Sequence, residues 1–238
     1  MKQETVVISL GGSVIVPRIS DEGGLNVAFL KAFKDMIVSE IKKGARFVIV
    51  AGGGKTSRAY QKDASVFSDV TKDDLDWIGI QATRLNAFAL KALFGALAYG
   101  WVIDGEPSVK ELRALRSSKK KLFLACGWKP GQSSDYEAVA LAKMFGAKSA
   151  VNASNIEFVY DKDPSAFKDA KAITEISWKE YRRLIPAKWT PGLGTPFDPV
   201  ASRLAQKEKV TVKIVCGTDL TNFRKAICQE PFSGTVIG

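Results

Sequence analysis

The stretch "VIVAGGGKTSRAYQ", residues 48 to 61, combines three glycines with a lysine and an arginine, residue types that suit phosphate binding. Glycines let a backbone approach an anion closely, and the free N–H groups at a helix start favour negative charge. The spacing is not that of a Walker A loop, which would need a glycine in place of Ile49. Nor is it the dinucleotide fingerprint, which would need a glycine at Ser57. Alone, the stretch is equally compatible with a phosphate-binding turn and an ordinary tight turn.

Three further turns of similar chemistry follow the expected ends of strands. They are Gly11-Gly12-Ser13, "GWKPGQSSD" at 127 to 135 and "NASN" at 152 to 155. In an open α/β sheet, such turns gather at the carboxyl ends of the strands, where ligands bind. Four of them together predict a site for two anionic ligands, or for one long ligand.

The elements that would position these turns alternate along the chain. Near-continuous apolar runs predict strands at 5–10, 46–51, 99–103, 121–126, 148–154, 209–217 and 234–237. Helical spacing and capping residues predict helices at 25–43, from about 55, from about 74 to 95, and at 107–115, 134–146 and 220–227. This alternation predicts a mostly parallel sheet with helices on both faces. The Pro/Gly-rich segment 186–199 is compatible with a linker or with a loop over the site.

Composition narrows the function further. The chain has 238 residues and no histidine, and its three cysteines lie far apart, which argues against a zinc site, a His-based triad or a disulfide framework. No apolar run reaches the roughly 20 residues of a membrane span. With no signal pattern and an odd cysteine count, we expect a cytoplasmic protein. The net charge of +10 is scattered apart from "RSSKKK" at 116 to 121, which favours a solvated turn over a nucleic-acid patch.

The ordered set of motifs is more specific than any one of them. "ISLGGSVIVP", "AGGGKTSRAY", "DWIGIQATRLNA", "PGQSSDYEAVALA", "NASNIEFVYDKDP" and "FDPVASRLA" occur in the order found in amino acid kinase family proteins. Over nearly the whole chain the sequence resembles the archaeal type of uridylate (UMP) kinase within that family. The resemblance implies an α/β fold, a three-layer αβα sandwich with a mostly parallel central sheet, in a single domain spanning 1–238. It also implies phosphate transfer from ATP to UMP and a homohexamer (a trimer of dimers) or a homodimer.

The resemblance also implies site residues. Arg58 would grip the phosphates, and Asp135 would organise cations around the transferred phosphoryl group. ATP would contact mainly the part from about 148 to 238, together with earlier turns, through Gly12, Ser13, Gly54, Arg58, Ser154, Asn155, Tyr160 and Asp163. UMP would contact mainly the part from about 1 to 147, through Gly53, Asp76, Trp128, Lys129, Pro130, Gly131, Gln132, Ser133 and Ser134. Mg²⁺ would be held mainly by the nucleotide phosphates, without a dedicated protein site.

Some positions depart from the family pattern or have simpler interpretations. Many amino acid kinases have a lysine where this chain has Ser9, and relatives often have a lysine where it has Arg203. Asp76 could be a helix-start acid, and Ser133-Ser134-Asp135 could be a helix cap. Two alternatives therefore stay open: a sister kinase that phosphorylates a carboxylate or carbamate, and a non-catalytic nucleotide-binding or oxyanion-storage protein.

Overall fold

The centre of the molecule is a seven-stranded sheet in the order β3-β2-β1-β4-β8-β9-β7. The computed structural model describes residues 5–20, 23–190 and 193–238. The first five strands of that order are mutually parallel. They are β3 (Leu122–Ala125), β2 (Arg46–Ala51), β1 (Thr5–Leu10), β4 (Ser149–Ser154) and β8 (Thr211–Cys216). β9 (Thr235–Ile237) runs antiparallel to β8, and β7 (Glu175–Ile176) runs parallel to β9. The predicted mostly parallel sheet is confirmed.

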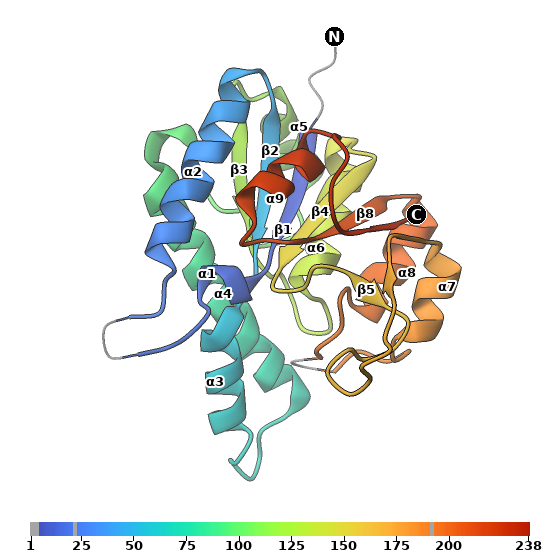
Figure 1. Cartoon of the computed structure of the whole chain (residues 1–238). Coiled ribbons are helices and arrows are strands. Elements are labelled where there is room, and N and C mark those ends of the chain that lie inside the picture. The colour runs from blue at the N-terminus through green and yellow to red at the C-terminus, as the bar shows by residue number, and fades with distance from the viewer. Residues whose placement is uncertain (1–4, 21–22, 191–192) are drawn as a thin grey trace.

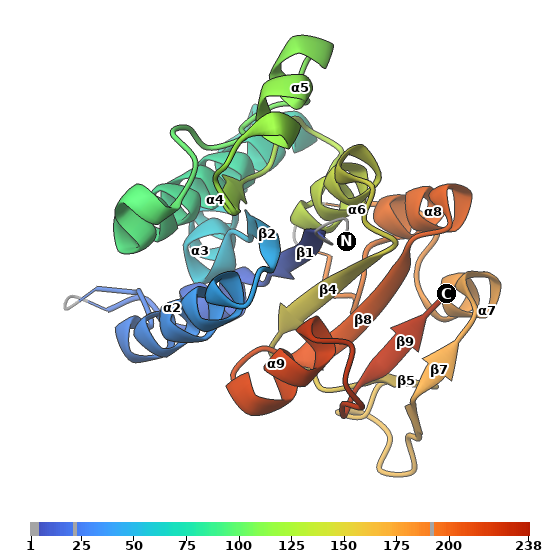
Figure 2. The same cartoon turned by 90° about the horizontal axis from the view of Figure 1, so that it is seen from above.

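Both faces of the sheet are buried because successive side chains of each strand point to opposite sides. Val7 of β1 and Val48 of β2 belong to one hydrophobic cluster, while their neighbours Ile8 and Ile49 belong to the other. Figure 2 shows the resulting layers, with α2 (Val27–Lys42) and α9 (Leu220–Ile227) on one side of the sheet. The helices α6 (Ser134–Phe145) and α8 (Pro199–Glu208) lie on the other side. This is the αβα sandwich that the sequence predicts.

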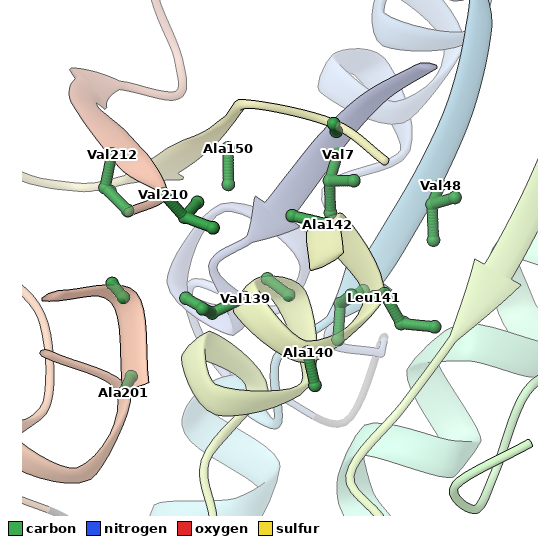
Figure 3. Packing of buried hydrophobic residues seen from close by; sticks show 14 of the residues in the cluster. Val7, Val48, Val139, Ala140, Leu141, Ala142, Ala150, Ala201, Val210 and Val212 are labelled. Carbon is green, nitrogen blue, oxygen red and sulfur yellow. The ribbon is translucent and has the colours of Figure 1, made fainter. Parts of the chain in front are cut away.

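The helix α6 is buried over most of its length, mainly through small and apolar side chains. Its residues Val139, Leu141 and Ala142 are fully buried and pack near Val7 and Val48 (Figure 3). Gly146 ends the helix in a left-handed conformation with φ of 72°, as its position after the last apolar residue predicts. Burying α6 in this way fixes its first turn at the carboxyl edge of the strands.

The remaining elements complete the layers and the site (Figure 1). They are α1 (Gly12–Ile15), α3 (Gly54–Ala64), α4 (Lys72–Phe94), the 3-10 turn η1 (Gly95–Leu97), α5 (Val109–Ser117), α7 (Trp178–Leu184) and the short hairpin β5 (Val159–Tyr160) and β6 (Ala172–Ile173). None of the described helices is both long enough and apolar enough to cross a membrane.

The strand predicted at 99–103 is wrong. Only isolated bridges form there, from Ala98 to Leu122 and from Ile103 to Ala125. The segment runs beside β3 and donates hydrogen bonds from Tyr99 and Ile103, but Gly100 and Trp101 between them leave the ladder. The helices α7 and α8 were not predicted, although a Ser177–Glu180 capping box begins the first of them.

Candidate active site

A cavity of about 700 Å³ lies at the carboxyl ends of the parallel strands. The cavity lies near β1, whose neighbours in the sheet are β2 on one side and β4 on the other. The strand order changes direction at this point. Ligands of open α/β sheets bind at such a switch in strand order. All four turns predicted from the sequence contribute lining residues, including Gly12, Gly53, Ser133 and Ser154. The structure therefore brings the four turns together.

Two glycine turns meet at the base of the cavity with almost no space between them. A Cβ atom added at Gly12 would lie 1.9 Å from the Gly54 nitrogen, and one added at Gly54 would lie 2.4 Å from the Gly12 carbonyl oxygen. Gly54 also has φ of 67°, a conformation that side chains disfavour. The beginnings of α1 and α3 approach each other so closely that only glycine fits at these two positions. The first N–H groups of a helix have no acceptor within the helix, which suits them to bind anions.

The long helix α4 holds two of the site loops with buried polar side chains. Asn86, which is 1% exposed, donates to the carbonyl oxygens of Gly52 and Gly53 at 2.7 and 3.2 Å. Thr83 accepts from the Gly127 N–H at 2.8 Å. Asp76 accepts from the Gly131 N–H at 2.7 Å. The positions of the phosphate turn and of the loop after β3 are thus set by one helix.

Asp135, at the start of α6, lies among neutral donors. Its Oδ1 accepts from the Ser9 hydroxyl at 2.9 Å and from the Asn152 side-chain amide at 3.0 Å. Ser133 caps α6 by accepting from the N–H groups of Asp135 and Tyr136, and it donates to Asp198. A second carboxylate, that of Asp198, therefore lies close to the first. No lysine stands at position 9 to neutralise the pair.

Burial and this second carboxylate make Asp135 a weak acid. Removal from water, and after it the negative charge of Asp198, raise the pKa of Asp135 to about 7. The pKa of Asp198 is also raised by burial, although the N–H groups of Ala201 and Val200 and the Ser133 hydroxyl favour its ionised form. Behind them, burial raises the pKa of Glu137 well above its usual range. A cation brought to Asp135 would offset this cost and favour its ionised form.

The cavity wall carries more acidic than basic side chains, although the chain is basic. Among the described lining residues the cations are Arg58 and Lys162, whereas the carboxylates are Asp76, Asp135, Asp161, Asp163 and Asp198. Lys162 pairs with Asp169 at 2.6 Å. In the described part of the chain, Arg58 has no ion-pair partner. Arg58 and Lys55 are both exposed, but only Arg58 belongs to the cavity lining.

The residues predicted to contact ATP line one region of the cavity. Ser13, Ser154, Asn155, Tyr160 and Asp163 all contribute to its wall. The Ser13 hydroxyl donates to the Asn155 side-chain carbonyl at 3.3 Å, which links the first glycine turn to the turn after β4. Asp163 accepts from the N–H and hydroxyl of Ser165, which lower the pKa of Asp163. This carboxylate therefore also caps a local turn.

Only part of the loop predicted to bind the acceptor lines the cavity. Its later residues Gln132, Ser133 and Ser134 line the cavity. Within the described residues, Trp128, Lys129, Pro130 and Gly131 do not belong to that lining. The Trp128 side chain packs into the hydrophobic cluster around α6 and is 7% exposed. Gly131 is exposed, and its N–H donates to the carboxylate of Asp76.

Sequence reasoning missed several residues that shape the site: Ser9 as an Asp135 donor, and Thr83, Asn86, Asn152, Trp189 and Asp198. For Asp198 a signal was available. Asp198-Pro199 places a capping acid before a proline at the first helical position, and the Asp198 side chain accepts from Val200 and Ala201 at 2.6 and 2.9 Å. The others depend on contacts distant in sequence.

The donor set suits a divalent cation that a ligand brings with it. Within the described residues, no group of three or more His, Cys, Asp or Glu side chains is arranged to hold a metal ion. Mg²⁺ commonly takes only one or two carboxylates from a protein and completes its shell with phosphate oxygens and water. Asp135, partly buried beside the two glycine turns, is the carboxylate that fits this role.

Comparison with known proteins gives a consistent result. Residues 4–216 match the amino acid kinase family. The chain is 32% identical to a uridylate kinase of Methanocaldococcus jannaschii over 98% of each protein. It is 30% identical to one of Hyperthermus butylicus over the full length of both. The crystal structure of uridylate kinase from Archaeoglobus fulgidus superposes with a TM-score of 0.78 at 30% identity, covering 98% of this chain and 99% of that one.

The first prediction concerns the pH dependence of stability. Folding raises the pKa of Asp135 from 3.8 to about 7, so the folded state binds this proton more tightly than the unfolded state. The free energy of unfolding should therefore fall as the pH rises from about 4 to 7. Asp135→Asn removes this titration. Because one pKa unit is worth about 1.4 kcal/mol, we expect its gain in Tm over wild type to be at least ~3 °C larger at pH 8 than at pH 4.5.

Thermal unfolding of both proteins at the two pH values measures this difference. Asp73→Asn, at an exposed acid in the first turn of α4, is the matched control. Its Tm difference from wild type should change by less than about 1 °C between the two pH values. An equal effect of Asp135→Asn at pH 4.5 and pH 8 would show that burial does not perturb this carboxyl group.

Proposed function

Since this chain belongs to the amino acid kinase family, we propose that it is a uridylate kinase, which transfers the γ-phosphate of ATP to UMP. The observation that carries the proposal is the pair of helix starts at Gly12 and Gly54, held together at the base of one cavity. Two helix starts held this close together present two sets of N–H groups, which suits two phosphate groups that must react with each other. A Walker A loop would instead wrap a single polyphosphate.

The roles of the residues follow from their places in the cavity. We assign Gly12, Ser13 and Gly54 to the ATP phosphates and Gly53 to the UMP phosphate. Ser154, Asn155, Tyr160 and Asp163, which come from the part after residue 148, would contact the rest of ATP. Asp76, Gln132, Ser133 and Ser134, from the part before it, would contact UMP. Trp128, Lys129 and Pro130 would then support the acceptor loop and not touch the nucleotide.

Phosphoryl transfer of this kind requires alignment and charge stabilisation more than proton transfer. The attacking oxygen belongs to a phosphate that is already ionised, so no general base is needed. Arg58 would neutralise charge on the transferred group through its planar guanidinium. Ser9 and Asn152 would fix the direction of the Asp135 carboxylate toward the cation that accompanies ATP.

We further propose Mg²⁺ as that cation, with Asp135 as its main protein contact. Asp135 would hold it, and when bound it would reduce the negative charge of the phosphates. The acidic wall supports this assignment, because two polyanionic ligands would otherwise face five carboxylates and two cationic side chains. A cytoplasmic location follows from the use of ATP and UMP as substrates and stays a prediction.

The alternatives are not favoured. A kinase for a carboxylate or carbamate would need a cationic pocket for the acceptor, whereas the wall here presents Asp76. A non-catalytic storage protein would have no need of the cavity-lining Arg58 together with Asp135. The absence of a lysine at position 9 was the best argument for such a protein, yet the Ser9 hydroxyl takes part in the site by bonding to Asp135.

The second prediction tests the function directly. We expect ADP release from ATP with UMP and Mg²⁺, at a kcat/KM at least ~10-fold above that for AMP or GMP, and none in excess EDTA. A coupled assay over a panel of monophosphates, carbamate and acetate measures it. Asp135→Asn is the control and should lower kcat at least ~10²-fold, the scale of losing a preorganised charge, while remaining folded. Turnover with carbamate or acetate alone, or with no acceptor, would overturn the proposal.

The third prediction separates the two cations of the phosphate turn. Both side chains are exposed, but Arg58 lines the cavity whereas Lys55, at the start of the same helix, lies outside the lining. Arg58→Ala should therefore lower kcat/KM for UMP by roughly 3 kcal/mol, about 10²-fold. Lys55→Ala is the matched control and should cost less than about 1 kcal/mol. Steady-state kinetics decides between them, and a larger loss for Lys55→Ala would reverse the assignment.

We also propose that the chain forms a homo-oligomer, a homohexamer or a homodimer. One face of α4 exposes large apolar side chains, with Trp77, Leu85 and Phe88 at 43%, 62% and 55% exposure. These positions share a side of the helix because, at 3.6 residues per turn, they fall within an arc of about 80°. A cluster of this kind on a helix surface is typical of an interface between subunits.

The fourth prediction follows for the assembly state. Leu85→Glu should lower the mass of the assembly, to a monomer from a homodimer or to a dimer or trimer from a homohexamer, because a charge buried in an apolar contact is not compensated there. Light scattering after size exclusion measures the mass. Val109→Glu, at an 80% exposed apolar residue of α5, is the matched control and should leave the mass unchanged. A wild-type protein that is monomeric at micromolar concentration would contradict the proposal.

A further inference from the structure

The segment that joins α7 to α8, residues 185–198, borders the cavity from the C-terminal half of the chain. Its described part is fixed near both ends. The Arg203 guanidinium donates to the Ala187 carbonyl at 3.0 Å. The buried Tyr181 hydroxyl donates to the Phe197 carbonyl and accepts from the Phe197 N–H, both at 2.7 Å. Trp189, between these two anchors, is half-buried and lines the cavity.

Trp189 reaches across the cavity to the helix that organises the acceptor side. Its indole Nε1 donates to Oδ2 of Asp76 at 3.5 Å, a contact between residues 113 positions apart. The same oxygen accepts from the Gly131 N–H at 2.7 Å. Asp76 is only 8% exposed, so the direction of its carboxylate is set by these two donors. The Asp76 carboxylate is therefore oriented by one donor from the N-terminal half of the chain and one from the C-terminal half.

The second oxygen of this carboxylate has a different environment. In the described part of the chain, no hydrogen bond is made to Oδ1 of Asp76. A carboxylate oxygen has two lone pairs, and when a ligand displaces water from them it must supply a donor in its place. Asp76 lines the cavity, so a ligand hydroxyl is the natural donor for Oδ1.

We propose that Trp189 is a positioning and specificity residue of the acceptor site. Its indole N–H, together with the Gly131 N–H, holds Asp76 so that Oδ1 accepts a ribose hydroxyl of the acceptor nucleotide. The indole ring also supplies a flat wall to the same part of the pocket. This inference rests on the proposed function, since it places the UMP ribose beside Asp76.

The test compares two replacements of the indole that differ in one hydrogen-bond donor. Trp189→Phe keeps an aromatic ring and loses the N–H, whereas Trp189→His keeps a ring nitrogen donor. We expect Trp189→Phe to raise KM for UMP about 5- to 10-fold, the scale of losing a bond to a charged group, with kcat and KM for ATP within about 2-fold. Trp189→His should restore at least half of the loss on a logarithmic scale. Trp101→Phe, at an exposed tryptophan outside the cavity lining, should change none of these constants.

Two further measurements distinguish positioning of Asp76 from simple support of the loop. The KM penalty of Trp189→Phe should disappear for whichever analogue, 2′-deoxy-UMP or 3′-deoxy-UMP, lacks the hydroxyl that Asp76 accepts. Trp189→Phe should also add less than about 2-fold to the KM of Asp76→Asn, because the two residues act through one interaction. Full penalties with both analogues, or additive effects of the two substitutions, would overturn the inference.

The outcomes for the inference and for the proposed function are separable. If wild-type protein phosphorylates no nucleoside monophosphate, the proposed function fails, and UMP titration by calorimetry then tests whether Trp189→Phe weakens binding. If wild type phosphorylates UMP and Trp189→Phe leaves its KM unchanged, only the inference fails. Thermal unfolding of each variant shows whether it is folded, and a Trp189→Phe protein with a lowered Tm is assayed well below that temperature.

Discussion

The site depends on the contact between two glycine turns. Gly12 begins α1 and Gly54 begins α3, and their backbones approach so closely that a methyl group on either would overlap the other. Each turn follows a strand of the same parallel pair, β1 and β2, so the sheet register brings both to one level, with Leu10 opposite Ala51. Because of this contact, two helix starts lie side by side, an arrangement that suits the proposed binding of two phosphates that react with each other. On that proposal, the three-glycine stretch is one half of a paired site.

The polar face of α4 also determines the geometry of the site, because it fixes the positions of two site loops. Asp76, Thr83 and Asn86 lie within three turns of one helix and hold backbone atoms of the loop after β3 and of the glycine turn. An apolar face of the same helix packs on the sheet through Ala87, Leu90 and Phe94. The site loops are therefore tied to the hydrophobic core through a single rigid element. Loops held in this way keep a geometry that loops alone would not maintain.

The sequence predicts the parts of this arrangement that local pattern controls. Apolar runs locate the five parallel strands, and helix caps locate α4 and α6, because these signals act over a few residues. The strand expected at 99–103 fails because Gly100 and Trp101 interrupt its pairing with β3. The direction of a side chain is harder to predict from the sequence. Trp128 lies in a predicted ligand loop, yet its ring packs into the core beside α6. The contact between Trp189 and Asp76 joins residues 113 apart, and no local pattern carries it.

The cavity lining is acidic although the chain as a whole is basic. The chain has a net charge of +10, but its cavity places five carboxylates against two cationic side chains. A lysine at position 9 would neutralise Asp135, whereas the Ser9 hydroxyl only directs it by a hydrogen bond. The pair of Asp135 and Asp198 is consequently costly to ionise, and a cation beside the pair would offset that cost. If Mg²⁺ accompanies ATP as proposed, this offset would favour binding of the metal–nucleotide complex over the free nucleotide. On the same proposal, the basic exterior would attract polyanions, and the acidic cavity would favour those that carry a cation.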